Sequence, residues 1–158
     1  MILGIDPGTT AVGYALIKKG PLPKMKTAGL FPITSRHRPG RLLELHQALK
    51  DLIDRQRPAV MALEKLFFAK NAKTALAVSE ARGVILLTAA LAGLKVLEYT
   101  PLEIKKALTG YGNADKLQVE KMVRLTLKEA RGLKARDDVF DAIAVALTCL
   151  FRDERHRY

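Results

Sequence analysis

Short apolar runs separated by turn residues open the chain, at residues 1–5, 11–18 and 27–33. Runs of this length, bounded by Pro, Gly and polar residues, predict an antiparallel β-meander. From Arg41 onward the leucines follow a helical spacing, which ends before Pro58. The pattern therefore predicts strands at the N-terminus, followed by a first helix.

The remainder of the chain alternates between short buried runs and helical periods. Two further strands are predicted at 59–63 and 95–99, and helices at 71–92, 101–108, 116–133 and 138–152. Strands before the first helix and strand–helix units after it are typical of an α/β fold, with a mixed sheet and helices on both faces. No linker divides the chain, so a single domain spanning 1–158 is expected.

Composition narrows the class of protein. The chain has 158 residues, 49% of them hydrophobic, which is enough for a substantial core. The excess of 27 Lys and Arg over 16 Asp and Glu gives a net charge of +11 and favours an anionic partner such as nucleic acid. Cys149 has no second cysteine with which to form a disulfide or a thiolate zinc site. With no apolar stretch as long as the roughly 20 residues of a membrane span, the expectation is a cytoplasmic protein without a membrane partner.

Four acidic residues stand where a carboxylate is costly. Asp6 and Glu64 each end an apolar strand, and Asp138 and Asp141 lie one helical turn apart. Clustered carboxylates repel one another and stay ionised only beside cations. Mg²⁺ prefers such oxygen ligands, and a pair of ions can stabilise both oxygens of a phosphodiester displacement. Asp137 lies four residues before Asp141 and is the alternative to Asp138 as the partner of Asp141.

Each of these acids also has a purely structural interpretation. Asp6 before Pro-Gly suits a turn, Asp138 suits a helix cap, and Glu64 could pair with a nearby lysine. Together they would require independent coincidences. The combination therefore favours metal-dependent phosphoryl chemistry on a polyanion, with water as the nucleophile.

Several motifs together resemble one known family. These are Ile2-Leu3-Gly4-Ile5-Asp6-Pro7-Gly8, then Glu64 with Phe67-Phe68-Ala69-Lys70-Asn71-Ala72, then Ala81-Arg82-Gly83-Val84, Gly110-Tyr111-Gly112 with Ala114-Asp115-Lys116, and Asp141-Ala142-Ile143-Ala144. In this order and spacing the chain resembles the RuvC-family Holliday junction resolvases over almost its whole length. The resemblance implies an RNase H-like fold with a mixed five-stranded sheet.

The resemblance also implies a function. It implies a homodimeric endonuclease that resolves four-way DNA junctions by paired nicks during recombination and repair, with a branch-migration motor as a further partner. The catalytic and metal-binding residues would be Asp6, Glu64, Asp138 and Asp141. The cofactor would be Mg²⁺, two ions per subunit, with Mn²⁺ as a substitute.

Basic and aromatic residues around these acids are candidates for DNA contact. Phe67 is expected to stack on an unpaired base, and the expected phosphate contacts are Lys70, Lys73, Lys105 and Lys116. Further along, a basic stripe is predicted on one side of the 116–133 helix, formed by Lys121, Arg124, Lys128 and Arg131. An ordinary solvated helix face is the alternative for this stripe.

Other functions share parts of the pattern. The segment 4–10 also resembles the phosphate-binding hairpin of actin-like ATPases, although those enzymes need two lobes and the chain has room for one. A YqgF-type ribonuclease of the same fold would act on structured RNA. A third alternative is a module that binds branched DNA without cutting it.

Overall fold

The computed structural model describes residues 1–8, 11–65 and 72–155, together with the side chains of these residues except 72–74 and 153–155. Within this part, five strands form a single mixed sheet in the order β3-β2-β1-β4-β5. Their bounds are β1 Ile2–Asp6, β2 Gly13–Lys18, β3 Lys24–Leu30, β4 Val60–Glu64 and β5 Val96–Tyr99. Strand β1 pairs antiparallel with β2 and parallel with β4, so it lies at the centre of the sheet.

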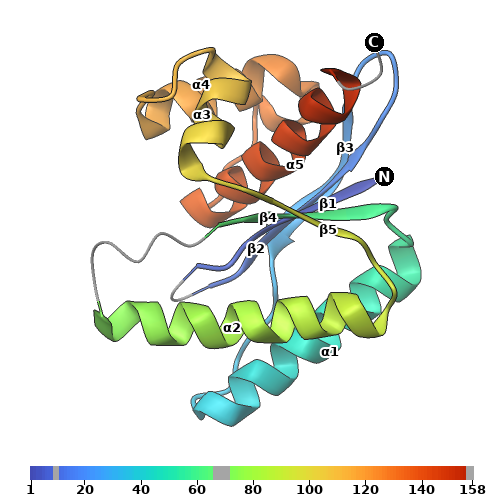
Figure 1. The fold of residues 1–158 in the computed structure, drawn as a ribbon, viewed down its shortest axis with the longest axis vertical. Coiled ribbons are helices and arrows are strands. Elements are labelled where there is room, and N and C mark those ends of the chain that lie inside the picture. Colours follow the sequence, from blue (N-terminus) through green and yellow to red (C-terminus); the bar gives the residue numbers. More distant parts are fainter. Residues whose placement is uncertain (9–10, 66–71, 156–158) are drawn as a thin grey trace.

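Helices cover both faces of this sheet (Figure 1). Helices α1 (Arg38–Gln56) and α2 (Ala72–Leu91) lie against one face. The other face carries α5 (Asp137–Arg155), with α3 (Pro101–Thr109) and α4 (Lys116–Thr126) packed beside it. The expected α/β class, with a mixed sheet between two helical layers, is therefore confirmed. None of the described helices combines the length and apolar character required to cross a bilayer.

The alternation of side chains along β1 explains these two layers. Ile2 points into the cluster around α5, whereas Leu3 and Ile5 point into the cluster around α1 and α2. Successive side chains of a strand face opposite sides of the sheet. A strand buried on both faces is therefore apolar without interruption, as the first residues of this chain are.

Small residues let α5 approach the sheet closely. A Cβ built on Gly4 would lie 2.2 Å from the main-chain oxygen of Ala142, and a Cβ built on Gly13 would lie 2.0 Å from that of Asp138. Any larger residue at either position would push the helix away. The glycines of β1 and β2 thus bring the acidic start of α5 directly onto the strands.

Some predicted boundaries were wrong. Strand β3 begins three residues earlier than predicted, at Lys24 instead of Thr27, because the exposed lysines of an edge strand look like a polar connection. The helix predicted to run to Leu133 ends at Thr126, where Leu127 turns to extended backbone and a short 3₁₀ turn follows at Lys128–Ala130. Helix α1 begins at Arg38, because Pro39 is tolerated in a first helical turn.

Candidate active site

Asp6 and Glu64 lie at the same edge of the sheet. Strands β1 and β4 are parallel, and Ile5 lies opposite Leu63, so the next residue of each strand is Asp6 or Glu64. By strand alternation both carboxylates project toward the α5 face, as do Ile2 and Ala62 in the cluster around that helix. The predicted pair of strand-end acids is therefore adjacent.

The start of α5 brings two more carboxylates to this edge. Asp141 and Asp138 lie in the first turns of the helix, and the side chain of Asp138 reaches the Asp6-Pro7-Gly8 turn, where a Cβ on Gly8 would lie 2.4 Å from its Oδ1. The structure thus gathers Asp6, Glu64, Asp138 and Asp141 from distant parts of the chain, as expected. Asp137 is mostly exposed and turns toward Lys116.

The electrostatics show that these carboxylates crowd one another. Burial is the largest of the causes that together raise the pKa of Asp6 to about 8. Neighbouring negative charges add to this rise, in the order Asp141, Glu64 and Asp138. Burial, with the charge of Asp141, also raises the pKa of Glu64 to about 7. Buried groups whose pKa values move toward neutrality are typical of functional sites.

Two basic side chains partly offset this negative charge. Lys116 Nζ lies 3.1 Å from Asp141 Oδ2 and 3.1 Å from Asp137 Oδ2, and Arg136 Nε lies 3.2 Å from Asp138 Oδ2. Burial lowers the pKa of Lys116, but its bonds to Asp141 and Asp137 raise it by more. Lys116 was expected to contact phosphate, and here its ammonium group already lies among the carboxylates.

The donor set fits a hard divalent cation in its chemistry. Every candidate ligand is a carboxylate oxygen, the type that Mg²⁺ prefers, and burial beside other carboxylates raises the pKa of Asp6 despite the nearby charge of Lys116. Among the described side chains, which are those of residues 1–8, 11–65 and 75–152, no three from Asp, Glu, His or Cys are already drawn together closely enough to enclose an ion. The arrangement is therefore a group of neighbouring carboxylates, some of them paired with Lys116 or Arg136.

A cleft of about 200 Å³ opens beside these acids. Glu64 and Asp141 line one part of it, and Lys105 and Lys116 bring positive charge to its border. Apolar side chains from α3, α4 and α5 form the rest of its wall. The lysines of this cleft suit the negative charge of a phosphodiester, and its acids would suit one through a bound divalent cation.

The predicted DNA contacts are distributed unevenly. Lys105 and Lys116 border the cleft, whereas Lys121 and Lys128 are exposed and do not line it. Phe67 and Lys70 lie outside the described residues, as does the side chain of Lys73. Because α4 ends at Thr126, the prediction that one helix carries the stripe is wrong: Lys128 and Arg131 follow the end of the helix. Lys121, Arg124 and Arg131 nevertheless line one surface cavity.

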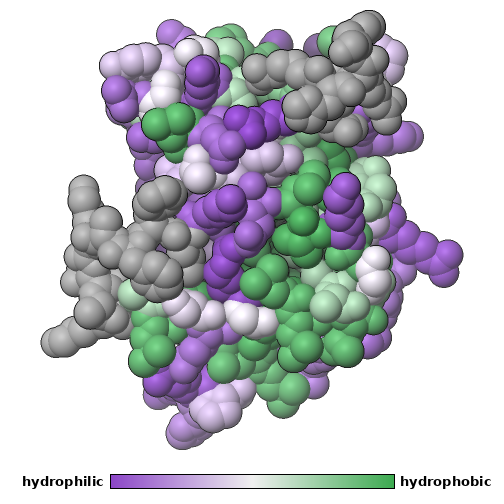
Figure 2. Space-filling view, in the orientation of Figure 1, coloured by the Kyte–Doolittle hydropathy of each residue, from purple (hydrophilic) through white to green (hydrophobic). Residues whose placement is uncertain are grey.

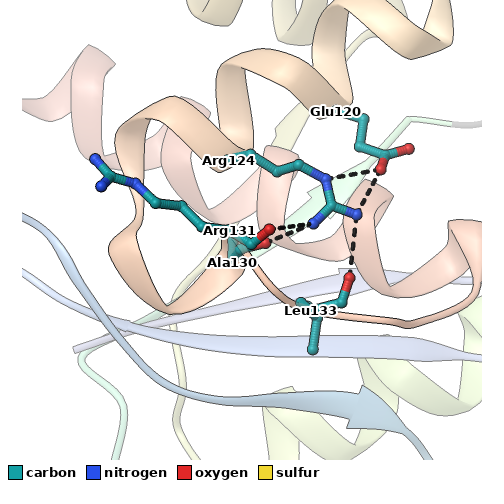
Figure 3. Close-up of polar contacts among 5 residues, drawn as sticks. All are labelled: Glu120, Arg124, Ala130, Arg131 and Leu133. Carbon is teal, nitrogen blue, oxygen red and sulfur yellow. Dashed lines mark hydrogen bonds and ion pairs between the residues drawn. The ribbon is translucent and has the colours of Figure 1, made fainter.

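Arg124 has a structural environment instead (Figure 3). Its Nε and Nη2 donate to Glu120, its Nη1 donates to the carbonyls of Ala130 and Arg131, and its Nη2 donates to that of Leu133. The guanidinium also lies 4.6 Å from the centre of the Phe140 ring. A guanidinium has five N–H donors, and these bonds use all of them. The predicted phosphate contact by Arg124 thus competes with a complete set of internal partners.

Comparison with known proteins identifies the family. The model of the family described as crossover junction endodeoxyribonuclease RuvC matches residues 2–149. The chain belongs to the RuvC family. The RuvC of Moorella thermoacetica is 48% identical over 155 residues, which cover 93% of this chain and 89% of that protein. The RuvC of a Roseiflexus species is 46% identical over 147 residues, covering 92% of this chain and 87% of the relative.

A solved RuvC structure agrees with the fold. Thermus thermophilus RuvC in complex with a Holliday junction substrate superposes with a TM-score of 0.87 and 33% identity, covering 98% of this chain and 95% of that one. The RNase H-like architecture expected from the sequence is thereby confirmed. Nucleases of the RuvC family depend on divalent metal ions, in agreement with the carboxylate ligands at the sheet edge.

Sequence reasoning missed some residues of the site. Arg136, which pairs with Asp138, was not among the candidates, although a basic residue directly before two acids was a usable signal. Lys105 and Lys116 were expected to contact phosphate. Their closeness to Glu64 depends on how α3 and α4 pack against α5, which no local pattern reveals.

Proposed function

We propose that this chain resolves four-way DNA junctions by metal-dependent hydrolysis at the edge of the sheet where β1, β4 and α5 meet. As a RuvC-family protein it is a crossover junction endodeoxyribonuclease, a hydrolase of DNA phosphodiester bonds. The observation that carries the proposal is the convergence of Asp6, Glu64 and Asp141 beside a cleft bordered by lysines. We further propose that these residues and Asp138 are the catalytic and metal-binding groups.

The residues divide the work between them. Asp6, Glu64, Asp138 and Asp141 would hold the cation, which we propose to be Mg²⁺, two ions per subunit, with Mn²⁺ as a substitute. When bound, the metal supplies charge stabilisation and lowers the pKa of water. Lys116 stabilises the ionised form of Asp141, and Lys105 carries positive charge toward Glu64.

DNA binding is proposed to extend outward from the cleft. The exposed ammonium groups of Lys121 and Lys128 would bind phosphates, while Phe67, Lys70 and Lys73 would contact the junction near the end of β4. The overall charge of +11 supports a polyanionic partner. The relative from Thermus thermophilus forms a complex with a Holliday junction substrate, which favours a four-way junction as the ligand here.

A homodimer is the proposed active assembly, because a junction has two strands to cut. Helix α2 exposes Leu76, Leu87 and Leu91 on its outer side. Figure 2 shows hydrophobic surface over the C-terminal part of α2, next to hydrophilic surface above it. We propose this face for subunit contact, a branch-migration motor as a further partner, and the cytoplasm as the site of action.

A cleavage assay with matched substrates tests the function. The purified protein is incubated with a synthetic four-way junction, a linear duplex or structured RNA, in Mg²⁺ or in EDTA. Paired nicks in the junction alone, only with Mg²⁺, are expected. Cleavage of the RNA but not of the junction would favour a ribonuclease, and junction binding without any nick would favour a non-catalytic binding module.

A further inference from the structure

Arg82 links three elements directly behind Glu64. Arg82 lies in α2, and its Nη1 donates a hydrogen bond of 2.6 Å to the main-chain carbonyl oxygen of Glu64. Its Nη2 forms an ion pair with Oε1 of Glu98 in β5. The Arg82 side chain is only 14% exposed. A buried guanidinium therefore joins α2 and β5 to the backbone of the residue that ends β4.

The sheet itself leaves this carbonyl without a partner on β1. The N–H groups of Met61 and Lys65 donate to main-chain carbonyls on the β5 side. The main-chain groups of successive residues in a strand face opposite neighbours, so the N–H and carbonyl groups of Ala62 and Glu64 face β1. Continued parallel pairing would bond the Glu64 carbonyl to the N–H of the residue after Asp6. That residue is Pro7, which has no N–H. The pairing of β1 with β4 accordingly stops at Ile5 and Leu63.

We propose that Arg82, held by Glu98, is a positioning residue for Glu64: its guanidinium supplies the hydrogen bond that Pro7 cannot donate and fixes the end of β4. The proposal rests on the catalytic role proposed for Glu64. Arg82 does not reach the reacting groups, and it acts through the backbone that carries the Glu64 carboxylate. Arg82 also connects α2 to the end of β4, so a shift of α2 would displace the Glu64 carboxylate.

The guanidinium geometry is essential to this role. Its planar fork presents one N–H to the carbonyl and another to Glu98 at the same time, which the single ammonium of a lysine reproduces poorly. Removing it would leave the carbonyl unsatisfied and Glu98 unpaired. The strand end would then be free to move, and a displacement of about 1 Å at a catalytic group can cost as much as a hundredfold in rate.

The test compares Arg82→Met, Arg82→Lys and Glu98→Gln in full-length protein. Single-turnover junction cleavage with saturating enzyme is measured beside junction affinity in EDTA, at a temperature where melting curves show every variant folded. Arg82→Met is expected to cut about ten to a hundred times more slowly, with affinity within about twofold of the original protein. Arg82→Lys should be intermediate, and Glu98→Gln should lose about fivefold.

Glu80→Gln is the matched control. Glu80 also lies in α2 and pairs with an arginine, Arg38 of α1, with Nε and Oε2 2.6 Å apart, but that pair does not touch β4. Its cleavage rate is expected to be unchanged. The double variant Arg82→Met/Glu98→Gln removes both charges and replaces Arg82→Met in the test if that single variant does not fold. It should cut as slowly as we expect for Arg82→Met.

The outcomes separate this inference from the proposed function. Wild-type cleavage rates for Arg82→Met or for the double variant, with Glu64→Gln inactive, would overturn the positioning role alone. Rate and affinity falling together in Arg82→Met, with an equal fall in Glu80→Gln, would also overturn it, because both changes would then act through general stability. A fully active Glu64→Gln would instead remove the proposed catalytic site.

Discussion

Two partly buried charged regions of this molecule are built in opposite ways. At the end of α4, Arg124 donates every N–H to Glu120 or to a main-chain carbonyl. At the sheet edge, Asp6 lies among Glu64, Asp138 and Asp141, and its pKa rises to about 8. Balanced charge stabilises a turn, whereas unbalanced charge costs stability until a ligand arrives. The contrast separates a structural charge from a functional one.

The largest expected effect is the loss of cleavage in Asp6→Asn or Glu64→Gln. Each change removes a negative ligand without changing side-chain size, so the rate should fall by roughly a thousandfold or more, as for removal of a principal charge-stabilising group. Junction affinity in EDTA should persist, because phosphate contacts dominate binding. Cleavage rates and gel-shift affinities are measured together, with Asp51→Asn, an exposed carboxylate of α1, as the control. Normal cutting by both variants would remove these residues from the site.

Arg124→Ala tests whether the Arg124 side chain stabilises the fold. Loss of its hydrogen bonds and its contact with Phe140 should lower the free energy of unfolding by about 2–4 kcal/mol, measured by urea denaturation. Junction affinity should change little where the variant is folded. Lys121→Ala, on the same helix but exposed, should leave unfolding unchanged. An Arg124→Ala protein of normal stability that binds junctions weakly would instead support the phosphate contact predicted from the sequence.

The buried acids at the sheet edge should make the stability of the protein depend on pH. Asp6 and Glu64 have folded pKa values of about 8 and 7, above their ordinary values of 3.8 and 4.5. Between about pH 4 and 8 the folded protein therefore holds protons that the unfolded chain has released, and stability falls as pH rises. In EDTA the melting temperature should be several degrees lower at pH 8 than at pH 5, since about 1 kcal/mol corresponds to roughly 2–4 °C.

Asp6→Asn tests the cause of this slope. Asparagine carries no titrating charge, so the variant should melt higher than the original protein at pH 8 and show a flatter pH profile. Mg²⁺ should raise the melting temperature of the original protein at pH 8 more than that of the variant. Parallel profiles for the two proteins would show that the acidic edge does not destabilise the fold.

The smallest effect is expected from single exposed lysines. Lys121→Ala should weaken junction binding a few-fold at low salt and reduce the slope of log affinity against log salt by about one. Fluorescence anisotropy across a salt series measures this. Lys50→Ala, on α1 and paired with Asp54, is the control and should retain the full slope. Equal slopes for all three proteins would place the DNA away from α4.

The sequence predicted the strand ends well because their signals are local. Asp6 and Glu64 each interrupt a run of apolar residues, and such runs define buried strands before any packing is known. The register that sets them side by side is not local, since it depends on pairing residues almost sixty positions apart. The family resemblance supplied that step, which periodicity alone could not.

The end of α4 shows where a local pattern misleads. Arg124, Lys128 and Arg131 continue a helical spacing, but the chain leaves the helix at Leu127. The carbonyls of the following turn are satisfied by Arg124 itself, a contact that depends on the turn folding back beside α5. Similarly, Lys116 meets Asp141 only because α4 packs on α5, so its ion pairs could not be deduced from spacing.

The position of a bound metal ion shows whether the acidic edge of the sheet is the metal site. Crystals of the protein soaked in Mn²⁺ can be measured at a wavelength where manganese scatters anomalously. We expect a strong anomalous peak in contact with Asp6 and Asp141, which is lost in Asp6→Asn. A peak elsewhere on the molecule, or an unchanged peak in Asp6→Asn, would contradict this expectation.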